Sequence, residues 1–117
     1  MSPSFELRLD AERYKAGDRV AGTVVAIAGG RSDSLQVHLD FVEKTDDYLD
    51  VASTISSGHL CQGDLQTGDW FRFEIALPPD ALPNYSSSHG QLYWRVHVQC
   101  ARRGRDSHEL RRIDVAS

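Results

Sequence analysis

The sequence lacks any apolar run near the roughly 20 residues that a membrane-spanning helix needs. Its first six residues also lack the basic region and apolar core of a signal peptide. We therefore expect no membrane span and a cytoplasmic location. A basic excess is missing too, because the net charge is −4, and this argues against nucleic-acid binding.

Cysteine is scarce, with Cys61 and Cys100 as the two examples in 117 residues. One disulfide is arithmetically possible. However, cytosolic proteins keep their thiols reduced, and a chain of this length buries roughly two thirds of its unfolded surface. We therefore predict two separate thiols and one domain spanning residues 1–117.

Helical periodicity is absent, and an alternation of apolar and polar residues takes its place. Turns that contain glycine, proline, asparagine or aspartate separate the alternating segments. The predicted strands are 5–9, 20–27, 35–41, 48–55, 70–77, 92–100 and 110–115. About seven short strands in one chain predict an all-β, immunoglobulin-like antiparallel sandwich. Gly22 inside a strand indicates a bulge or the close approach of a neighbouring element.

Three parts of the chain resemble arrestin-like domains. Residues 14–24, with the pattern Y-K-A-G-D-R-V-A-G-T-V, are similar to the opening hairpin of that family. Residues 71–78 resemble its F-x-F-x-x-x-L-P strand ending, and 82–85 with 90–98 resemble its P-S-Y loop and the strand after it. The resemblance implies an arrestin-type sandwich that acts as a protein-interaction or scaffolding module. The bacterial sporulation-control relatives carry two such sandwiches in tandem, whereas this chain has room for one.

Arginine supplies the main candidate for partner binding. The cluster consists of Arg102, Arg103, Arg105, Arg111 and Arg112. A hairpin that turns at residues 104–107 would gather these side chains, and guanidinium groups bind carboxylate or phosphate in a bidentate manner. We therefore expect an acidic or phosphorylated protein partner, or the acidic 40–50 segment of a second copy in a homodimer. The alternative is a solvated edge hairpin whose charges prevent unwanted strand pairing.

Two aromatic residues, Trp70 and Tyr93, are predicted to point away from the core. Exposed tryptophan and tyrosine are typical of interfaces. They are also typical of a carbohydrate-binding β-sandwich, which is the alternative function. A neighbouring loop would equally well cover them.

No pattern of catalytic or metal-binding residues stands out. The histidines lack zinc-ligand spacing with cysteine, and there is no G-x-S-x-G nucleophile elbow. His38 and His97 fall on the outward faces of two predicted strands and would converge with Asp40 if those strands were neighbours. We expect a solvated sheet face there rather than a metal site. The prediction is a chain that is not an enzyme and uses no cofactor.

Overall fold

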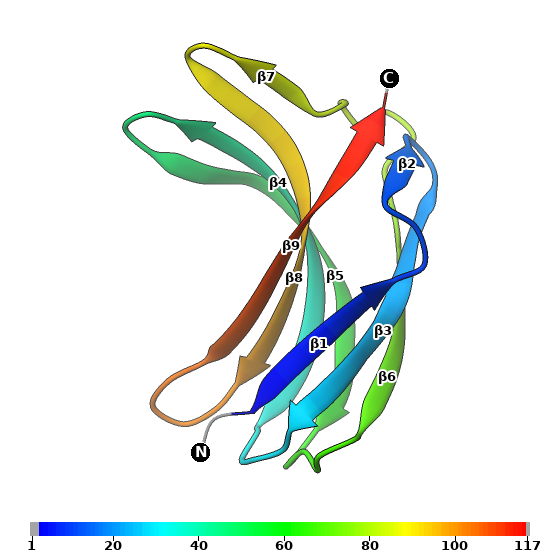
Figure 1. Ribbon diagram of the computed structural model, residues 1–117, viewed down its shortest axis with the longest axis vertical. Helices are drawn as coiled ribbons and strands as arrows, with labels where there is room; N and C mark the ends of the chain where they lie inside the picture. The colour runs from blue at the N-terminus through cyan, green and yellow to red at the C-terminus, as the bar shows by residue number, and fades with distance from the viewer. Residues whose placement is uncertain (1–2, 117) are drawn as a thin grey trace.

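Nine strands and no helix make up residues 3–116, the part of the chain that the computed structural model describes (Figure 1). No segment of this part forms a helix with the length and apolar character that a membrane crossing requires. The strands are β1 (Ser4–Leu9), β2 (Arg13–Lys15), β3 (Arg19–Ala28), β4 (Ser34–Thr45), β5 (Leu49–Gln62), β6 (Trp70–Ala76), β7 (Tyr85–Ser87), β8 (Gly90–Ala101) and β9 (Ser107–Ala116).

The strands form two sheets that pack face to face (Figure 1). The small sheet has the order β1-β3-β6, and the large sheet has the order β2-β9-β8-β4-β5, with β7 paired to β8. This confirms the predicted all-β sandwich. Periodicity missed β2 and β7 because each has three residues, too few to show alternation. One pair, β2 with β9, is parallel rather than antiparallel.

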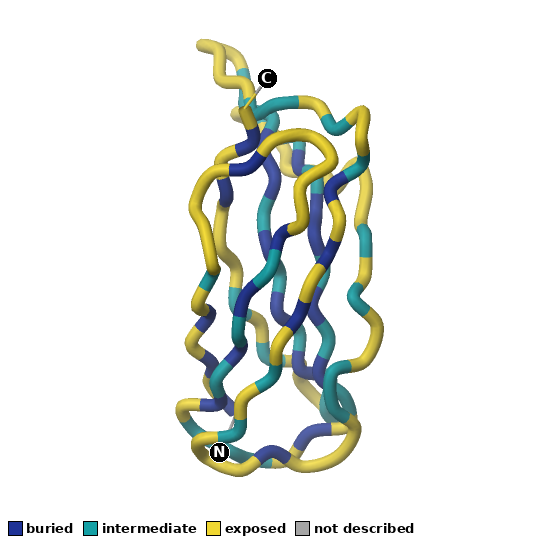
Figure 2. The backbone as a smooth tube through the Cα atoms, turned by 90° about the vertical axis from the view of Figure 1, so that its right-hand side faces the viewer, coloured by how far each residue is buried: buried dark blue, intermediate teal, exposed yellow. Residues whose placement is uncertain are grey.

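Alternate side chains of both sheets meet in one apolar core, and the front strands of Figure 2 alternate between buried and exposed positions accordingly. Apolar residues with at most 1% exposure include Val20, Val24, Leu35, Val37, Leu39, Val96 and Val98. The Trp94 indole lies at one end of this core, where its Nε1–H donates to the Leu82 carbonyl over 2.8 Å. This bond fixes the loop between β6 and β7 to the sandwich.

Gly22 allows the close approach that its place in a strand predicts. A Cβ atom added there would lie 2.5 Å from the Arg8 carbonyl oxygen and 3.1 Å from the Phe73 ring. These distances are shorter than normal contacts, so the pairing of β3 with β1 requires glycine at this position.

Cys61 and Cys100 are separate thiols, as predicted. Both lie opposite Leu35, Cys61 on β5 and Cys100 on β8, with β4 between them. Two strand spacings amount to about 9.6 Å, which is beyond the Cα separation that a disulfide spans.

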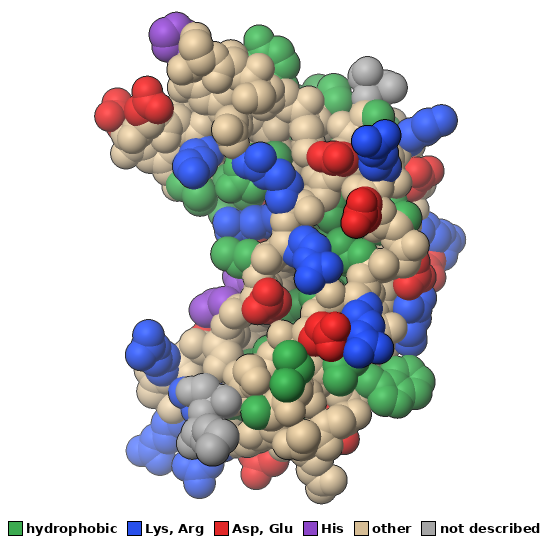
Figure 3. Space-filling view, in the orientation of Figure 1, with side chains coloured by type: hydrophobic (Ala, Val, Ile, Leu, Met, Phe, Trp, Pro, Cys, Tyr) green, Lys and Arg blue, Asp and Glu red, His purple; other side chains and the backbone are tan. Residues whose placement is uncertain are grey.

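The large sheet extends beyond the small one and curls away from it, so that its outer face is concave (Figures 1 and 3). Its strands β4, β5 and β8 have 12 to 14 residues, whereas β1, β3 and β6 have 6 to 10. The register of β4 against β5 shifts in three places, and such bulges bend and twist a strand. The molecule is therefore a crescent, and we call the outward-facing side chains of β9, β8, β4 and β5 the concave face.

Candidate functional site: the concave face

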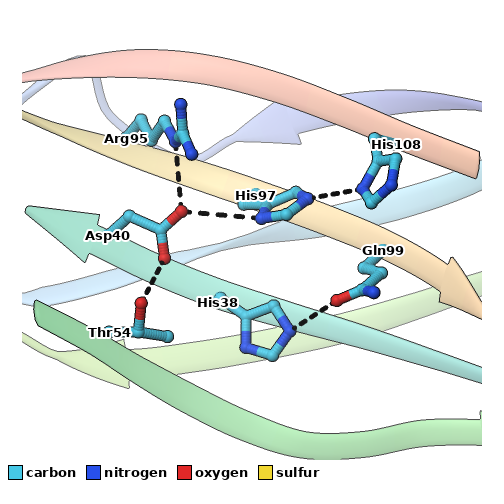
Figure 4. Close-up of polar contacts among 7 residues, drawn as sticks. All are labelled: His38, Asp40, Thr54, Arg95, His97, Gln99 and His108. Atoms are coloured by element: carbon cyan, nitrogen blue, oxygen red, sulfur yellow. Dashed lines mark hydrogen bonds and ion pairs between the residues drawn. The ribbon is translucent and has the colours of Figure 1, made fainter. Parts of the chain in front are cut away.

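Chemistry-bearing side chains on the concave face come together because β4 and β8 are direct neighbours. In their register His38 lies opposite His97, and Asp40 lies opposite Arg95. These residues alternate with buried core residues of the same strands, so they point away from the sandwich core. Figure 4 shows the resulting group of polar contacts.

Asp40 is the centre of this group. Its Oδ2 accepts a hydrogen bond from Arg95 Nε at 3.1 Å and lies 3.5 Å from His97 Nδ1. Its Oδ1 accepts a hydrogen bond from the Thr54 hydroxyl at 2.9 Å. The Asp40 residue is 3% exposed, so the expected solvated sheet face is wrong at this point. The side chains of Arg95, His97 and Thr54 surround the carboxylate and leave little of it exposed.

The environment keeps Asp40 ionised. Burial raises the pKa of its carboxyl group, but the hydrogen bonds from His97, Arg95 and Thr54 together lower it further than burial raises it. The net pKa is below the ordinary value for aspartate. At neutral pH the carboxylate therefore balances the charge of Arg95.

The histidines extend the group along the concave face. His97 Nε2 lies 2.7 Å from His108 Nδ1, so one of these two nitrogens donates and the other accepts. His38 Nε2 contacts Gln99 Oε1 at 3.2 Å and donates to it, because an amide oxygen can only accept. The His38 and His97 rings are 5.6 Å apart. Within residues 3–116, no three histidine, cysteine or acidic side chains are arranged to hold a metal ion.

Tyr93 points away from the core as predicted and lies on the concave face, but it is only 9% exposed because a neighbouring side chain covers it. The guanidinium carbon of Arg112 lies 3.8 Å from the centre of the Tyr93 ring, at cation–π distance. Arg112 Nη2 also donates to Gln91 Oε1 over 2.6 Å. The ring is covered by a charged side chain rather than by a loop, and that side chain is thereby held in place.

The five predicted arginines do not form one cluster. Arg102, Arg103 and Arg105 lie in the turn between β8 and β9, whereas Arg111 and Arg112 lie within β9. Because side chains alternate along a strand, Arg111 and Arg112 face opposite sides of the sheet. The segment of β9 from Ser107 to Arg112 extends about 17 Å at the ordinary rise of a strand, so Arg112 lies far from the arginines of the turn. A hairpin was correctly predicted, but strand alternation and strand length separate its charges.

Trp70 points away from the core as predicted, with 65% of its surface exposed. It lies on the outer face of the small sheet, next to Val25 of β3. Tyr93 is on the outer face of the other sheet, so the two rings do not form the aromatic strip that a carbohydrate-binding face would need.

Sequence reasoning missed Arg95, Thr54 and His108 as members of the concave face. The alternation over residues 92–100 places Arg95 and His97 on one side of the same strand, and this was an available signal. Thr54 and His108 depend on strand neighbours and register, which a single sequence does not specify.

Comparison with solved structures identifies the fold. Spo0M, a sporulation control protein from Bacillus subtilis, matches 100% of this chain with a TM-score of 0.62 at 19% sequence identity. The fold is arrestin-like. The chain spans 50% of the length of Spo0M, so this arrestin-like sandwich corresponds to about half of that protein.

Other matches are weaker. A β-glucosidase from Listeria innocua matches 98% of this chain and 16% of its own length, with 16% identity and a TM-score of 0.39. A β-glucosidase from Erythrobacter marinus matches 97% of this chain and 16% of its own length, with 11% identity and a TM-score of 0.32. TM-scores this low do not indicate a shared fold. No protein-family model matches the sequence, and no curated protein matches it either.

Proposed function

We propose that this chain is a non-catalytic protein-interaction module with a regulatory role, and that the concave face of its large sheet is the binding surface. The observation that carries the proposal is the Asp40–Arg95–His97 group. It is an ion pair held at fixed geometry on a sheet face that no other element of residues 3–116 covers.

A solvated sheet face does not need such an arrangement. Taking charged groups out of water is costly unless they are paired and hydrogen-bonded. Here the side chains of Asp40 and Arg95 are 4% and 14% exposed. A face whose donors and acceptors are fixed in advance loses less conformational entropy when a partner binds.

The charge on this face favours an acidic group on the partner. Arg95 and Arg112 are direct cross-strand neighbours, an arrangement that repels unless a counter-charge lies near. Asp40 balances one of them, and Arg112 forms no ion pair with any described residue. We therefore favour a protein partner that presents a carboxylate or phosphate group, to which a guanidinium binds well.

The comparison with Spo0M supports a regulatory role, because that protein is a sporulation control protein. Fold alone does not define function. The comparison therefore supports the kind of role, and the concave face itself supports the binding surface.

The test is affinity capture from the native organism, at low and at high salt, with the wild-type chain and the Arg112→Gln variant. The glutamine keeps much of the side chain that covers Tyr93 but removes the charge. We expect a partner that is captured by the wild-type chain at low salt and lost both at high salt and with Arg112→Gln.

The matched control is Arg13→Gln, which removes an exposed arginine from β2. It should capture the same partner as the wild-type chain. If Arg112→Gln captures the partner as well as Arg13→Gln does, while Trp70→Ala loses it, the binding surface is the small sheet and the proposal is wrong.

A further inference from the structure

The two ends of the crescent carry opposite charges. The β4–β5 hairpin, residues 43–50, has four carboxylates against one lysine, and we call it the acidic horn. The β8–β9 turn, residues 102–106, has three arginines against one aspartate, and we call it the basic horn. Figure 3 shows red side chains on the upper projection and blue side chains on the lower one, with the hollow between them.

The register of the large sheet places the horns far apart. Ser34 of β4 pairs with Ala101 of β8, next to the basic horn, and Thr45 at the other end of β4 adjoins the acidic horn. A strand of 12 residues is about 40 Å long. The horns therefore cannot neutralise each other within one molecule.

Two exposed charges at each horn have no ion-pair partner among the described residues nearby. Asp46, Asp47, Arg103 and Arg105 are exposed, and none of them forms an ion pair with any residue in 3–116.

The small sheet differs, because exposed charges on it form ion pairs. On its outer side Arg72 pairs with Asp10 at 2.7 Å, and Arg19 pairs with Glu74. These two pairs are thus compensated within residues 3–116, while Asp46, Asp47, Arg103 and Arg105 are not.

We infer that the horns bind each other between two copies of this chain. A two-fold axis that turns one copy end over end brings each acidic horn to the basic horn of the other copy. Such a contact is self-complementary and closed, as two-fold dimers require. The inference rests on the proposed interaction role and adds a second copy as partner, recognised by charge.

Pairing through a sheet edge is a weaker way to form the dimer. The longest free edge, β5, carries the three register irregularities against β4, and such bulges hinder strand addition. The horns need no backbone pairing, because their exposed side chains reach beyond the hairpins.

Charge exchange between the horns tests this dimer. Variant A is Arg103→Glu with Arg105→Glu, which makes both horns acidic. Variant B is Asp46→Arg with Asp47→Arg, which makes both horns basic. Sedimentation equilibrium at low salt should show a dimer for the wild-type chain and a loss of association of more than about 100-fold for A alone and for B alone.

An equimolar mixture of A and B should dimerise again, since each horn then meets an opposite charge. A chain with all four substitutions should also dimerise, because its horns are exchanged. High salt should dissociate every dimer, since exposed charges are screened within about 10 Å at 0.1 M ionic strength. A control chain with Arg13→Glu and Asp80→Arg, both exposed positions away from the horns, should behave like the wild type.

Two results would overturn the dimer: a wild-type chain that stays monomeric at low salt, or a mixture of A and B that stays monomeric while the wild type dimerises. Neither affects the proposed function, which is tested at Arg112 by capture of another protein. Conversely, if the chain forms the horn-dependent dimer but captures no partner through Arg112, the dimer is supported. The concave face is then not a partner site.

Discussion

Replacing Asp40 by asparagine tests whether the ion pair on the concave face stabilises the fold. The change keeps the size of the side chain and one acceptor oxygen, but it removes the negative charge beside Arg95 and His97. Loss of one member of a buried ion pair typically costs about 3–5 kcal/mol, because the remaining charge is left unpaired. Since the Arg95 side chain keeps 14% exposure and reaches some water, we expect about 3 kcal/mol.

Urea denaturation at pH 7, followed by tryptophan fluorescence, measures this cost, and thermal unfolding should show a midpoint lower by about 10 °C. The pH dependence has a definite sign. The pKa of Asp40 is lower in the folded chain than its ordinary value, so its stabilisation is present above the unfolded pKa. It is lost as the pH falls through the folded pKa, and the gap between wild type and Asp40→Asn should narrow below about pH 4.

The double variant Asp40→Asn, Arg95→Met separates the ion pair from a general packing defect. If the pair is the cause, the double variant should lose less stability than the two single changes together. A cost below about 1 kcal/mol at pH 7, or an equal gap at pH 7 and in acid, would refute the reasoning.

Two further predictions concern the sandwich itself. Gly22→Ala should destabilise the fold by more than about 1 kcal/mol in urea denaturation, because the Cβ atom of the alanine would lie 2.5 Å from the Arg8 carbonyl oxygen. An unchanged denaturation midpoint would show that β1 shifts freely to make room. Acrylamide should quench the fluorescence of Trp70, which is 65% exposed, but hardly that of Trp94, which is 3% exposed. Trp70→Phe should therefore remove most of the quenching, and strong residual quenching would contradict the burial of Trp94.

The alternation of side chains explains why the fold class could be predicted. Over residues 94–99 each apolar residue is followed by a polar one, and such a segment can bury one side only as a strand. The same pattern placed Arg95, His97 and Trp70 on outward faces. The three-residue strands β2 and β7 were out of reach, because so short a segment shows no period.

The arrestin-like fold could also be recognised from the segments 14–24, 71–78 and 82–85 with 90–98. These segments carry turn residues, a glycine inside a strand at position 22 and a strand that ends at Ala76, shortly before Pro78, and each of these is a local feature of the chain. Local requirements of this kind are visible in one sequence.

The concave face depended on tertiary structure. Strand order decides that β8 lies between β9 and β4, and register decides that Asp40 meets Arg95 and that Arg112 covers Tyr93. A shift of one residue would turn each of these side chains to the other face.

The sequence by itself therefore determined the strands, their inward and outward sides and the unequal distribution of charge, because each of these depends on residues that are near one another in the chain. Tertiary structure alone decided which charges meet. It paired Asp40 with Arg95 across two strands, set Arg112 beside Arg95, and placed the acidic and basic hairpins at opposite ends of one curved sheet. The physical reason is that contacts between strands are set by register and curvature, which arise from the packing of the whole sheet.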